Sequence, residues 1–403
     1  MVKNMIQKFK NKRIAVVGAG LGGLCLAQGL KKNGISCMIF EKDAAMNIRT
    51  QGYRIRINKP GRNALKECLP ENLYTLFLET CAASTTGMRV FNTSLEESKN
   101  ELVESWSDGV KEMPDLKPNR LTLREILLHG LQENIQFGKE LVSWKELENE
   151  ETELLFADGT QYIADLVIAG DGVHSKIGAE QCKDQKINTG NITIYGRTFF
   201  TDEAKDQIAS ALHKGTSVIL GEQFSLITDA MEFNFPLKNE SWNLLAPMEN
   251  YFYWAFIGNP EAFGLSQSDF YSQSPEEVFE CIHKLTDRWH PKLKALFKYA
   301  DKQSLSITPI RSSLPKKQWK SGSITALGDA VHTMSPAGGV GANTAFIDAA
   351  LLTENISAAL MKNTSIIEAV ADYEKKMRIY SNHAVEMSLR GGEILHGTTE
   401  KNS

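Results

Sequence analysis

Residues 13–23 read Arg-Ile-Ala-Val-Val-Gly-Ala-Gly-Leu-Gly-Gly. The first five, Arg13–Val17, form a short β-branched run that is typical of a buried parallel strand. The glycines Gly18, Gly20 and Gly23 fit the pattern G-x-G-x-x-G, and apolar residues then recur at helical spacing. This order of strand, glycine-rich turn and helix predicts the first unit of a doubly wound domain that binds a dinucleotide.

Each glycine of this motif has a physical role, and so does an acid downstream. Gly18 permits the tight turn, Gly20 lets the backbone approach a pyrophosphate, and Gly23 lets the helix pack close to the strand. A second strand, Ser36–Phe40, ends at Glu41, whose carboxylate is placed to accept hydrogen bonds from ribose hydroxyls. Because a 2′-phosphate would meet this negative charge, the pattern predicts FAD or NAD and does not choose between them.

A second glycine-rich loop opens a helix late in the chain. Residues 323–329 form an apolar strand that ends in Gly328 and Asp329, and small residues follow up to position 343. A flavin needs such an arrangement, because Asp329 can bind the ribityl chain and the helix N-terminus can face the N1–C2=O edge of the isoalloxazine. This loop therefore favours FAD. The residues expected at that N-terminus are Gly341, Ala342 and Asn343.

With these motifs the chain resembles the class A flavoprotein monooxygenases related to 4-hydroxybenzoate and salicylate hydroxylases. It is also similar to the tetracycline-inactivating monooxygenases of that group. The resemblance covers about residues 12–360. The family pattern GDAAHxxxPxxGxGxN, followed by DA, is matched at Gly328, Asp329, Ala330, His332, Pro336, Gly341, Asn343, Asp348 and Ala349.

Two shorter signatures of the same family are present. Residues 171–178 match DGxxSxVR, with Asp171 in first place and Gly178 where the family has arginine. In the family this segment is associated with FAD and with the pyridine nucleotide, so nicotinamide docking is the property that the substitution affects. A further signature, R-x-x-L-R-x-x-L, implies that Arg120 contacts the flavin cofactor, with Arg124 one turn later in support.

The order of the motifs predicts how the chain is organised. From about residue 191 to 308, short alternating strands replace the βαβ rhythm, and the cofactor motifs lie on both sides of this stretch. We therefore predict an α/β fold (an α+β composite) in which a Rossmann-like FAD-binding domain carries an inserted, mostly antiparallel β-sheet domain and a C-terminal helix. The resemblance implies that the inserted sheet is the substrate-binding domain, because in the family it covers the flavin and forms most of the substrate pocket. The expected ranges are 1–185 and 307–365 for the FAD-binding domain, 186–306 for the sheet domain and 366–403 for the helix.

An aromatic run, Tyr251–Phe256, lies in the inserted part. On a strand, Trp254 and Phe256 share one face. They can form an aromatic wall for a planar substrate together with Phe224, and the alternative interpretation is a sheet whose core is packed with aromatic residues. Three arginines border flavin or nicotinamide in the resembled family, and the sequence does not say which of them contacts a cofactor: Arg49, Arg54 and Arg56.

Together the motifs predict an FAD-dependent monooxygenase. It would use NADPH or NADH as a transient cosubstrate and O₂ to oxygenate a small, electron-rich aromatic or polyketide-like compound through a flavin C4a-hydroperoxide. Pro336, Gly338 and Gly339 are expected on the flavin face where oxygen reacts, and no side-chain base is assigned. Two alternatives stay open: an FAD-linked reductase or dehydrogenase of the same fold, and a non-catalytic flavin-binding regulatory protein, which Gly178 favours.

Composition excludes several other classes. The 403 residues include 45 basic and 49 acidic side chains, for a net charge of -4, so nothing favours nucleic-acid binding. Six scattered cysteines without a C-x-x-C pair predict reduced thiols, no metal site and a cytoplasmic location. No apolar stretch reaches the roughly 18 residues of a membrane span. We expect a monomer or a homodimer.

Overall fold

The parallel sheet that the N-terminal motif predicts is present. The computed structural model describes residues 12–46, 53–83, 88–98, 114–234, 245–266 and 273–395. Five parallel strands lie in the order β15-β9-β1-β2-β5. Every residue of β1 and β9 is buried, as in strands that are covered on both faces. Their bounds are β1 (Ile14–Val17), β2 (Cys37–Glu41), β5 (Ile135–Phe137), β9 (Leu166–Ala169) and β15 (Ile324–Ala326).

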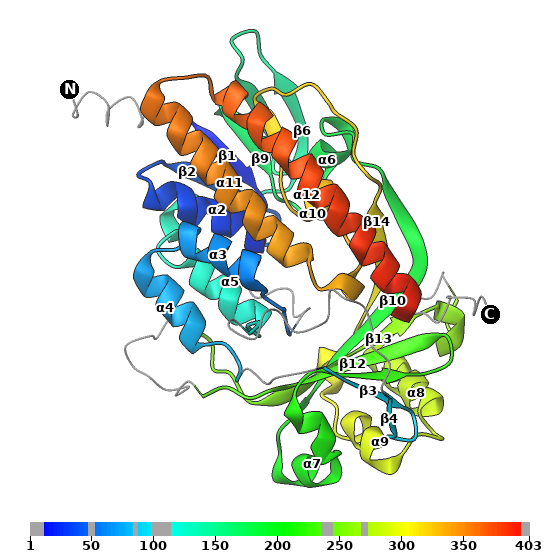
Figure 1. Ribbon diagram of the computed structural model, residues 1–403. Helices are drawn as coiled ribbons and strands as arrows, with labels where there is room; N and C mark the ends of the chain where they lie inside the picture. The colour runs from blue at the N-terminus through cyan, green and yellow to red at the C-terminus, as the bar shows by residue number, and fades with distance from the viewer. Residues whose placement is uncertain are drawn as a thin grey trace.

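Helices pack around this sheet. The long helices α11 and α12 run side by side along the molecule, and α11 also packs against α2 and α3 (Figure 1). The helix expected within 366–403 is α12. The helices of this part are α2 (Leu21–Lys32), α3 (Lys59–Cys68), α4 (Glu71–Glu79), α5 (Arg120–Leu128), α6 (Lys176–Glu180), α10 (Asp329–His332), α11 (Gly341–Lys362) and α12 (Ile366–Leu395).

A second sheet has seven strands in the order β14-β10-β13-β12-β11-β3-β4. Its neighbours are antiparallel except β3 and β11. The helices α7 (Asp202–Gln207), α8 (Pro275–Leu285) and α9 (Pro291–Lys298) cover its outer face (Figure 1). The strands are β3 (Arg89–Asn92), β4 (Glu97–Ser98), β10 (Lys186–Phe199), β11 (Ser217–Leu220), β12 (Phe224–Met231), β13 (Tyr251–Gly258) and β14 (Ser306–Ser313).

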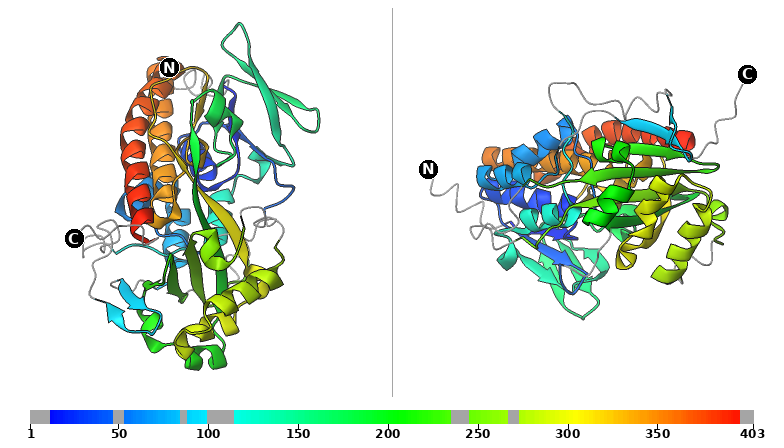
Figure 2. Two further views of the ribbon diagram at one scale, coloured as in Figure 1. Left: turned by 90° about the vertical axis from the view of Figure 1, so that its right-hand side faces the viewer. Right: turned by 90° about the horizontal axis from the view of Figure 1, so that it is seen from below.

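This arrangement confirms the expected fold class, and the second sheet draws on more of the chain than residues 186–306. Its strand β14 continues to Ser313, and β3 and β4 come from residues 89–98 because β3 pairs with the edge of β11. A small antiparallel sheet of β6 (Leu141–Glu146), β7 (Thr152–Phe156) and β8 (Gln161–Ala164) projects from the parallel sheet (Figure 2). Within the described ranges, no helix is both long and apolar enough to cross a membrane.

Candidate functional site

Two glycines of the loop after β1 lie where a Cβ would collide with the backbone. Gly18 has φ +100°, and a Cβ on it would lie 2.5 Å from the carbonyl oxygen of Gly170. A Cβ on Gly23 would lie 2.3 Å from the carbonyl oxygen of Gly18. Helix α2 then begins after Gly20 without a side-chain cap from any described residue. Its first N–H groups are therefore available to an anion such as a pyrophosphate.

Glu41, at the end of β2, fixes this loop. Its carboxylate is 6% exposed and accepts hydrogen bonds from the backbone N–H groups of Ala19 at 2.7 Å and Asp43 at 3.0 Å. Arg124 of α5 donates from Nε to the carbonyl oxygen of Ala19 at 2.9 Å, and its Nη2 lies 3.5 Å from Glu41 Oε2. A carboxylate offers about four acceptor positions, so Glu41 can still bind a ribose hydroxyl.

Arg120, Asp329 and Tyr195 come together from three parts of the chain. Asp329 is exposed, yet desolvation by the surrounding protein raises the pKa of its carboxyl, while His332, Arg120 and Lys186 lower it. Burial likewise raises the pKa of Tyr195, which also senses the charges of Arg120 and Asp329. Asp329 is thus accessible from the space beside it although the surrounding protein desolvates it, as expected of an acceptor for a bound ligand.

Unsatisfied groups around this space fit an FAD. The Oδ1 atom of Asp171 is buried without a hydrogen-bond partner among the described residues, and burial raises the pKa of this carboxyl. A Cβ on Gly172 or Gly341 would meet nothing within 4 Å. Helix α11 begins at Gly341 without a side-chain cap from the described part of the chain. Acceptor, space and free N–H groups are what the ribose, phosphate and isoalloxazine of FAD require.

The turn before α11 packs against α12 on one side and against the second sheet on the other. The 3₁₀ turn η7 (Pro336–Gly338) has Pro336 exposed, and Ala337 packs against Val218, Ile257 and Ile310 of the sheet. Gly339 then takes φ +61°. These contacts define the inner face of the seven-stranded sheet as the face opposite α7, α8 and α9.

Asn343 acts as a structural clamp in this region. Its Nδ2 donates to the carbonyl oxygens of Arg56 at 2.8 Å and Gly339 at 3.1 Å, and its Oδ1 accepts from the N–H of Asn58 at 3.0 Å. Only 2% of the residue is exposed. Its side chain is thus engaged with protein, and only its backbone N–H is left to point toward a cofactor.

The structure corrects the expected aromatic wall. Trp254, Phe256 and Phe224 lie on the outer face, where they pack against Phe297 and Trp289 of the α8–α9 region. None of the three is more than 6% exposed. The physical reason is the two-residue period of a strand, because β13 is apolar on both faces and its sequence does not show which one meets the cofactor part.

Tyrosines occupy the inner face instead. Tyr253 of β13 lies beside Tyr195 of β10, with ring centroids 6.4 Å apart. Burial raises the pKa of Tyr253, so its phenol stays protonated at neutral pH. The alternation of residues 251–257 would have pointed to Tyr251 and Tyr253 if the orientation of the strand had been known.

A buried ion cluster adjoins these tyrosines. Asp229 of β12 lies 2.8 Å from Arg54 Nε and 2.9 Å from Lys117 Nζ, and it accepts a hydrogen bond from Thr216 at 2.7 Å. Of the three arginines singled out from the sequence, Arg54 thus belongs to the inner face. Arg56 pairs with Asp115 and lies near Gly339, and Arg49 is outside the described residues. Sequence patterns did not indicate Asp229 or Lys117.

Gly178, in the position of the family arginine, is buried in α6. A Cβ on it would lie 1.7 Å from the carbonyl oxygen of Ala330, so this backbone accommodates no side chain. Lys186 of β10 instead reaches that carbonyl oxygen at 3.4 Å and pairs with Asp184 at 2.5 Å. A cation therefore reaches the Asp171–Asp329 region from the second sheet.

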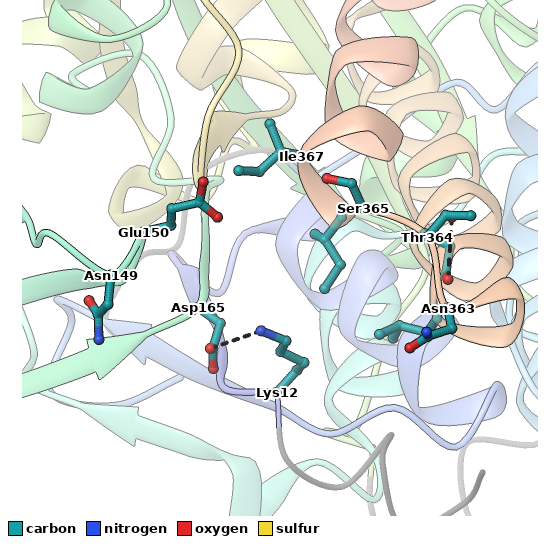
Figure 3. Close-up of a pocket in the computed structure, with 11 residues that line it drawn as sticks. Lys12, Asn149, Glu150, Asp165, Asn363, Thr364, Ser365 and Ile367 are labelled. Atoms are coloured by element: carbon teal, nitrogen blue, oxygen red, sulfur yellow. Dashed lines mark hydrogen bonds and ion pairs between the residues drawn. The ribbon is translucent and has the colours of Figure 1, made fainter.

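A surface pocket of about 300 Å³ lies elsewhere, at the corner between α11 and α12 (Figure 3). Lys12 and Asp165 line it and form an ion pair at 3.2 Å. These residues precede β1 and β9, whereas the glycine-rich loop follows the carboxyl ends of the strands, where ligands of doubly wound folds bind. The pocket is therefore separate from the candidate cofactor site.

Comparisons with known proteins agree with this site. The family described as "FAD binding domain" matches residues 119–388, and the family described as "NAD(P)-binding Rossmann-like domain" matches residues 16–64. The chain therefore belongs to the FAD binding domain family, and the relatives it is similar to are named FAD-dependent monooxygenases. This confirms the resemblance, the oxidoreductase class and FAD as the cofactor.

Individual relatives cover the chain almost completely. The "Dual O-methyltransferase/FAD-dependent monooxygenase CTB3" of Cercospora beticola is 31% identical over 413 residues, which cover 96% of this chain and 46% of that protein. The chain thus spans about half the length of this relative. A crystal structure of a candidate FAD containing monooxygenase from Photorhabdus luminescens subsp. laumondii TTO1 has a TM-score of 0.82 and 28% identity over 97% of this chain and 100% of that chain. HpxO from Klebsiella pneumoniae, solved with FAD and uric acid, shares the fold with a TM-score of 0.74 and 22% identity over 96% of this chain and 90% of that chain.

Proposed function

We propose that this protein is an FAD-dependent monooxygenase that uses NADPH or NADH and O₂ to oxygenate a small, electron-rich aromatic or polyketide-like compound. In this reaction one oxygen atom enters the substrate and the other leaves as water, and the nicotinamide supplies the two electrons. Bound FAD supplies the activation of O₂. The cysteines, all six of which are free, agree with a reducing, cytoplasmic location.

The observation that carries the proposal is the position of the η7 turn. It has small residues at Ala337, Gly338 and Gly339, directly precedes α11, and packs between α12 and the inner face of the second sheet. A turn without bulky side chains leaves room for oxygen and substrate beside a planar cofactor. The apolar contacts of Ala337 help to exclude water from this turn. A reactive oxygen species needs a site without water, because water promotes its wasteful loss.

The chain's own residues then have separate roles. The loop at Gly18 and Gly20, with Glu41, would hold the ADP half of the cofactor, and Asp171 would accept a hydrogen bond from the cofactor. Asp329 and Arg120 would hold the ribityl and flavin half. The backbone N–H groups at Gly341, Ala342 and Asn343 would stabilise negative charge on the flavin edge.

Tyr195 and Tyr253 of the inner face are the residues that we propose to contact the substrate. Both phenols are protonated at neutral pH, so each can donate or accept a hydrogen bond. The neighbouring Arg54 adds a positive charge that is shared with Asp229. This face suits an aromatic compound that carries hydroxyl or carbonyl groups.

The test combines cofactor, electrons and oxygen in one experiment. Purified protein should carry yellow FAD, and NADPH or NADH consumption should be measured with O₂ uptake across a panel of phenols, naphthols and polyketide-like aromatics. Uptake that a compound stimulates, with one atom of ¹⁸O₂ in the product, supports the proposal. Equal turnover without O₂ and with another acceptor indicates a reductase, and the absence of reduction by either nicotinamide indicates a non-catalytic flavoprotein.

A further inference from the structure

A buried carboxylate with no role in the proposed chemistry, Asp348 of α11, lies at the centre of a hydrogen-bond network. Its Oδ2 accepts from the backbone N–H of Gly328 at 2.8 Å and lies 2.5 Å from Nε2 of His332. Its Oδ1 accepts from the hydroxyl of Tyr380 in α12 at 2.5 Å. Asp348 and His332 are both 0% exposed. Through Asp348 and Tyr380, the helices α11 and α12 are thus hydrogen-bonded in one network with the turn that contains Gly328 and His332.

The turn that they bind has an unusual backbone. Gly328 takes φ 61° and ψ -145°, a conformation that only glycine adopts at low cost. The next residue is Asp329, the expected acceptor for the ribityl chain. Such a conformation persists only where the surroundings hold it, and the bond from Gly328 N–H to Asp348 does so directly. The orientation of Asp329 therefore depends on Asp348.

The hydrogen bonds of this network indicate which ring nitrogen of His332, in the same turn, carries the proton. His332 Nδ1 is buried and has no hydrogen-bond partner within the described ranges, so Nε2 carries the proton that Asp348 accepts. A buried carboxylate is costly unless each oxygen is hydrogen-bonded, and an apolar side chain would join α11 to α12 equally well. Both oxygens of Asp348 are hydrogen-bonded, and a carboxylate with its hydrogen bonds satisfied specifies a single geometry for the groups around it.

We propose that Asp348 is a positioning residue for the riboflavin half of FAD and that it acts through the turn at Gly328 and Asp329. Tyr380 connects α12 to the same hydrogen-bond network. The inference rests on FAD as the cofactor and not on the proposed oxygenation. It predicts that the two halves of FAD respond differently to loss of the network. The affinity for the riboflavin half should fall, and the affinity for the ADP half, which would bind near Gly18 and Glu41, should not change.

The experiment measures the affinity of the full-length apoprotein for FAD by quenching of flavin fluorescence, and for ADP by competition. Asp348→Ala should weaken FAD binding at least about tenfold, because the buried N–H of Gly328 loses its acceptor, and should change the ADP affinity less than about twofold. Asp348→Asn should restore most of the FAD affinity, because an amide oxygen still accepts from Gly328 and the amide N–H can donate to Tyr380.

A hydroxyl deletion provides the matched comparison. Tyr380→Phe should weaken FAD binding about threefold to tenfold. The control is Tyr373→Phe, which removes from the same helix a buried hydroxyl whose hydrogen bond goes to the carbonyl oxygen of Ala326 at 2.9 Å and not to Asp348. This control should leave FAD affinity within about twofold. If Asp348→Ala does not fold, the tyrosine pair carries the test alone.

Three results would overturn the proposal. One is unchanged FAD affinity in Asp348→Ala. Another is an equal loss of FAD and ADP affinity, which would indicate general damage to the fold. The third is an equal effect of Tyr380→Phe and Tyr373→Phe on FAD affinity, which would indicate that the network only packs α12 against the protein. None of these measurements requires the substrate or turnover, so monooxygenase activity can be absent while the proposal stands.

Discussion

Gly178→Ala is the substitution whose effect the structure predicts most sharply. On helix propensity alone, alanine in place of glycine in α6 should stabilise the protein by up to about 1 kcal/mol. The added Cβ, however, would lie 1.7 Å from the carbonyl oxygen of Ala330, so the two backbones must separate by more than about 1 Å to restore normal contact. Overpacking of this kind costs about 1–3 kcal/mol, and a rigid backbone neighbour places the cost at the upper end.

We therefore expect a net loss of about 2 kcal/mol in the free energy of unfolding, together with weaker FAD binding because Ala330 adjoins Asp329. The assays are urea unfolding of the apoprotein and retention of FAD on gel filtration. Gly391→Ala is the control, since its Cβ in α12 would make only ordinary contacts of 3.9–4.0 Å. The reasoning is refuted if Gly178→Ala is as stable as the wild type and retains FAD equally well.

Four further substitutions test the remaining assignments. Trp254→Ala should lower the free energy of unfolding by about 3–5 kcal/mol, because it truncates a core residue. Tyr253→Phe should keep the fold and the FAD content but lower kcat/KM for a hydroxylated substrate. The reverse pattern would show that Trp254, and not Tyr253, faces the substrate. Glu41→Gln should weaken FAD binding about tenfold, measured on the apoprotein, because the loop at Ala19 loses a charged acceptor; unchanged affinity would remove Glu41 from the site. Desolvation raises the pKa of Asp171 and Asp329, so each carboxylate becomes protonated and loses acceptor strength as pH falls through its raised pKa. FAD affinity should therefore fall from about pH 7 to about pH 4 more steeply in the wild type than in Asp171→Asn. Parallel profiles would count against the role of Asp171.

The local motifs were predictable because each combines a spacing with a backbone requirement. Gly18 and Gly23 are at positions where a Cβ would collide with the backbone, and Glu41 follows directly from the end of a strand. The fold class followed from the motif order. In contrast, the sequence does not show which face of β13 is turned toward the cofactor-binding part, because tertiary packing decides the orientation of the strand. For this reason Trp254 and Tyr253 could not be distinguished from the sequence.

The partners of each motif residue were not predictable, because they come from distant positions without a local pattern. Lys186 reaches the region of Gly178 from the second sheet, and Tyr380 reaches Asp348 from α12. Nothing about a lysine at the start of a strand or a tyrosine in a mixed-charge helix marks it as part of a cofactor site. Such residues are found only once the packing of the elements is known.

The two sheets also depend on each other for the cofactor site itself. Tyr251, on the inner face of β13, donates to the carbonyl oxygen of Tyr53 at 2.6 Å and accepts from Nδ2 of Asn119 at 2.8 Å. Asn119 caps α5, whose first residue is Arg120. The second sheet therefore orients an arginine that we assign to the flavin, and Lys186 of β10 adds a charge near Asp329. A cofactor domain cut out along the predicted boundaries would lack both supports. The inserted sheet therefore supports the candidate flavin site, in addition to the substrate contacts that we propose for its inner face.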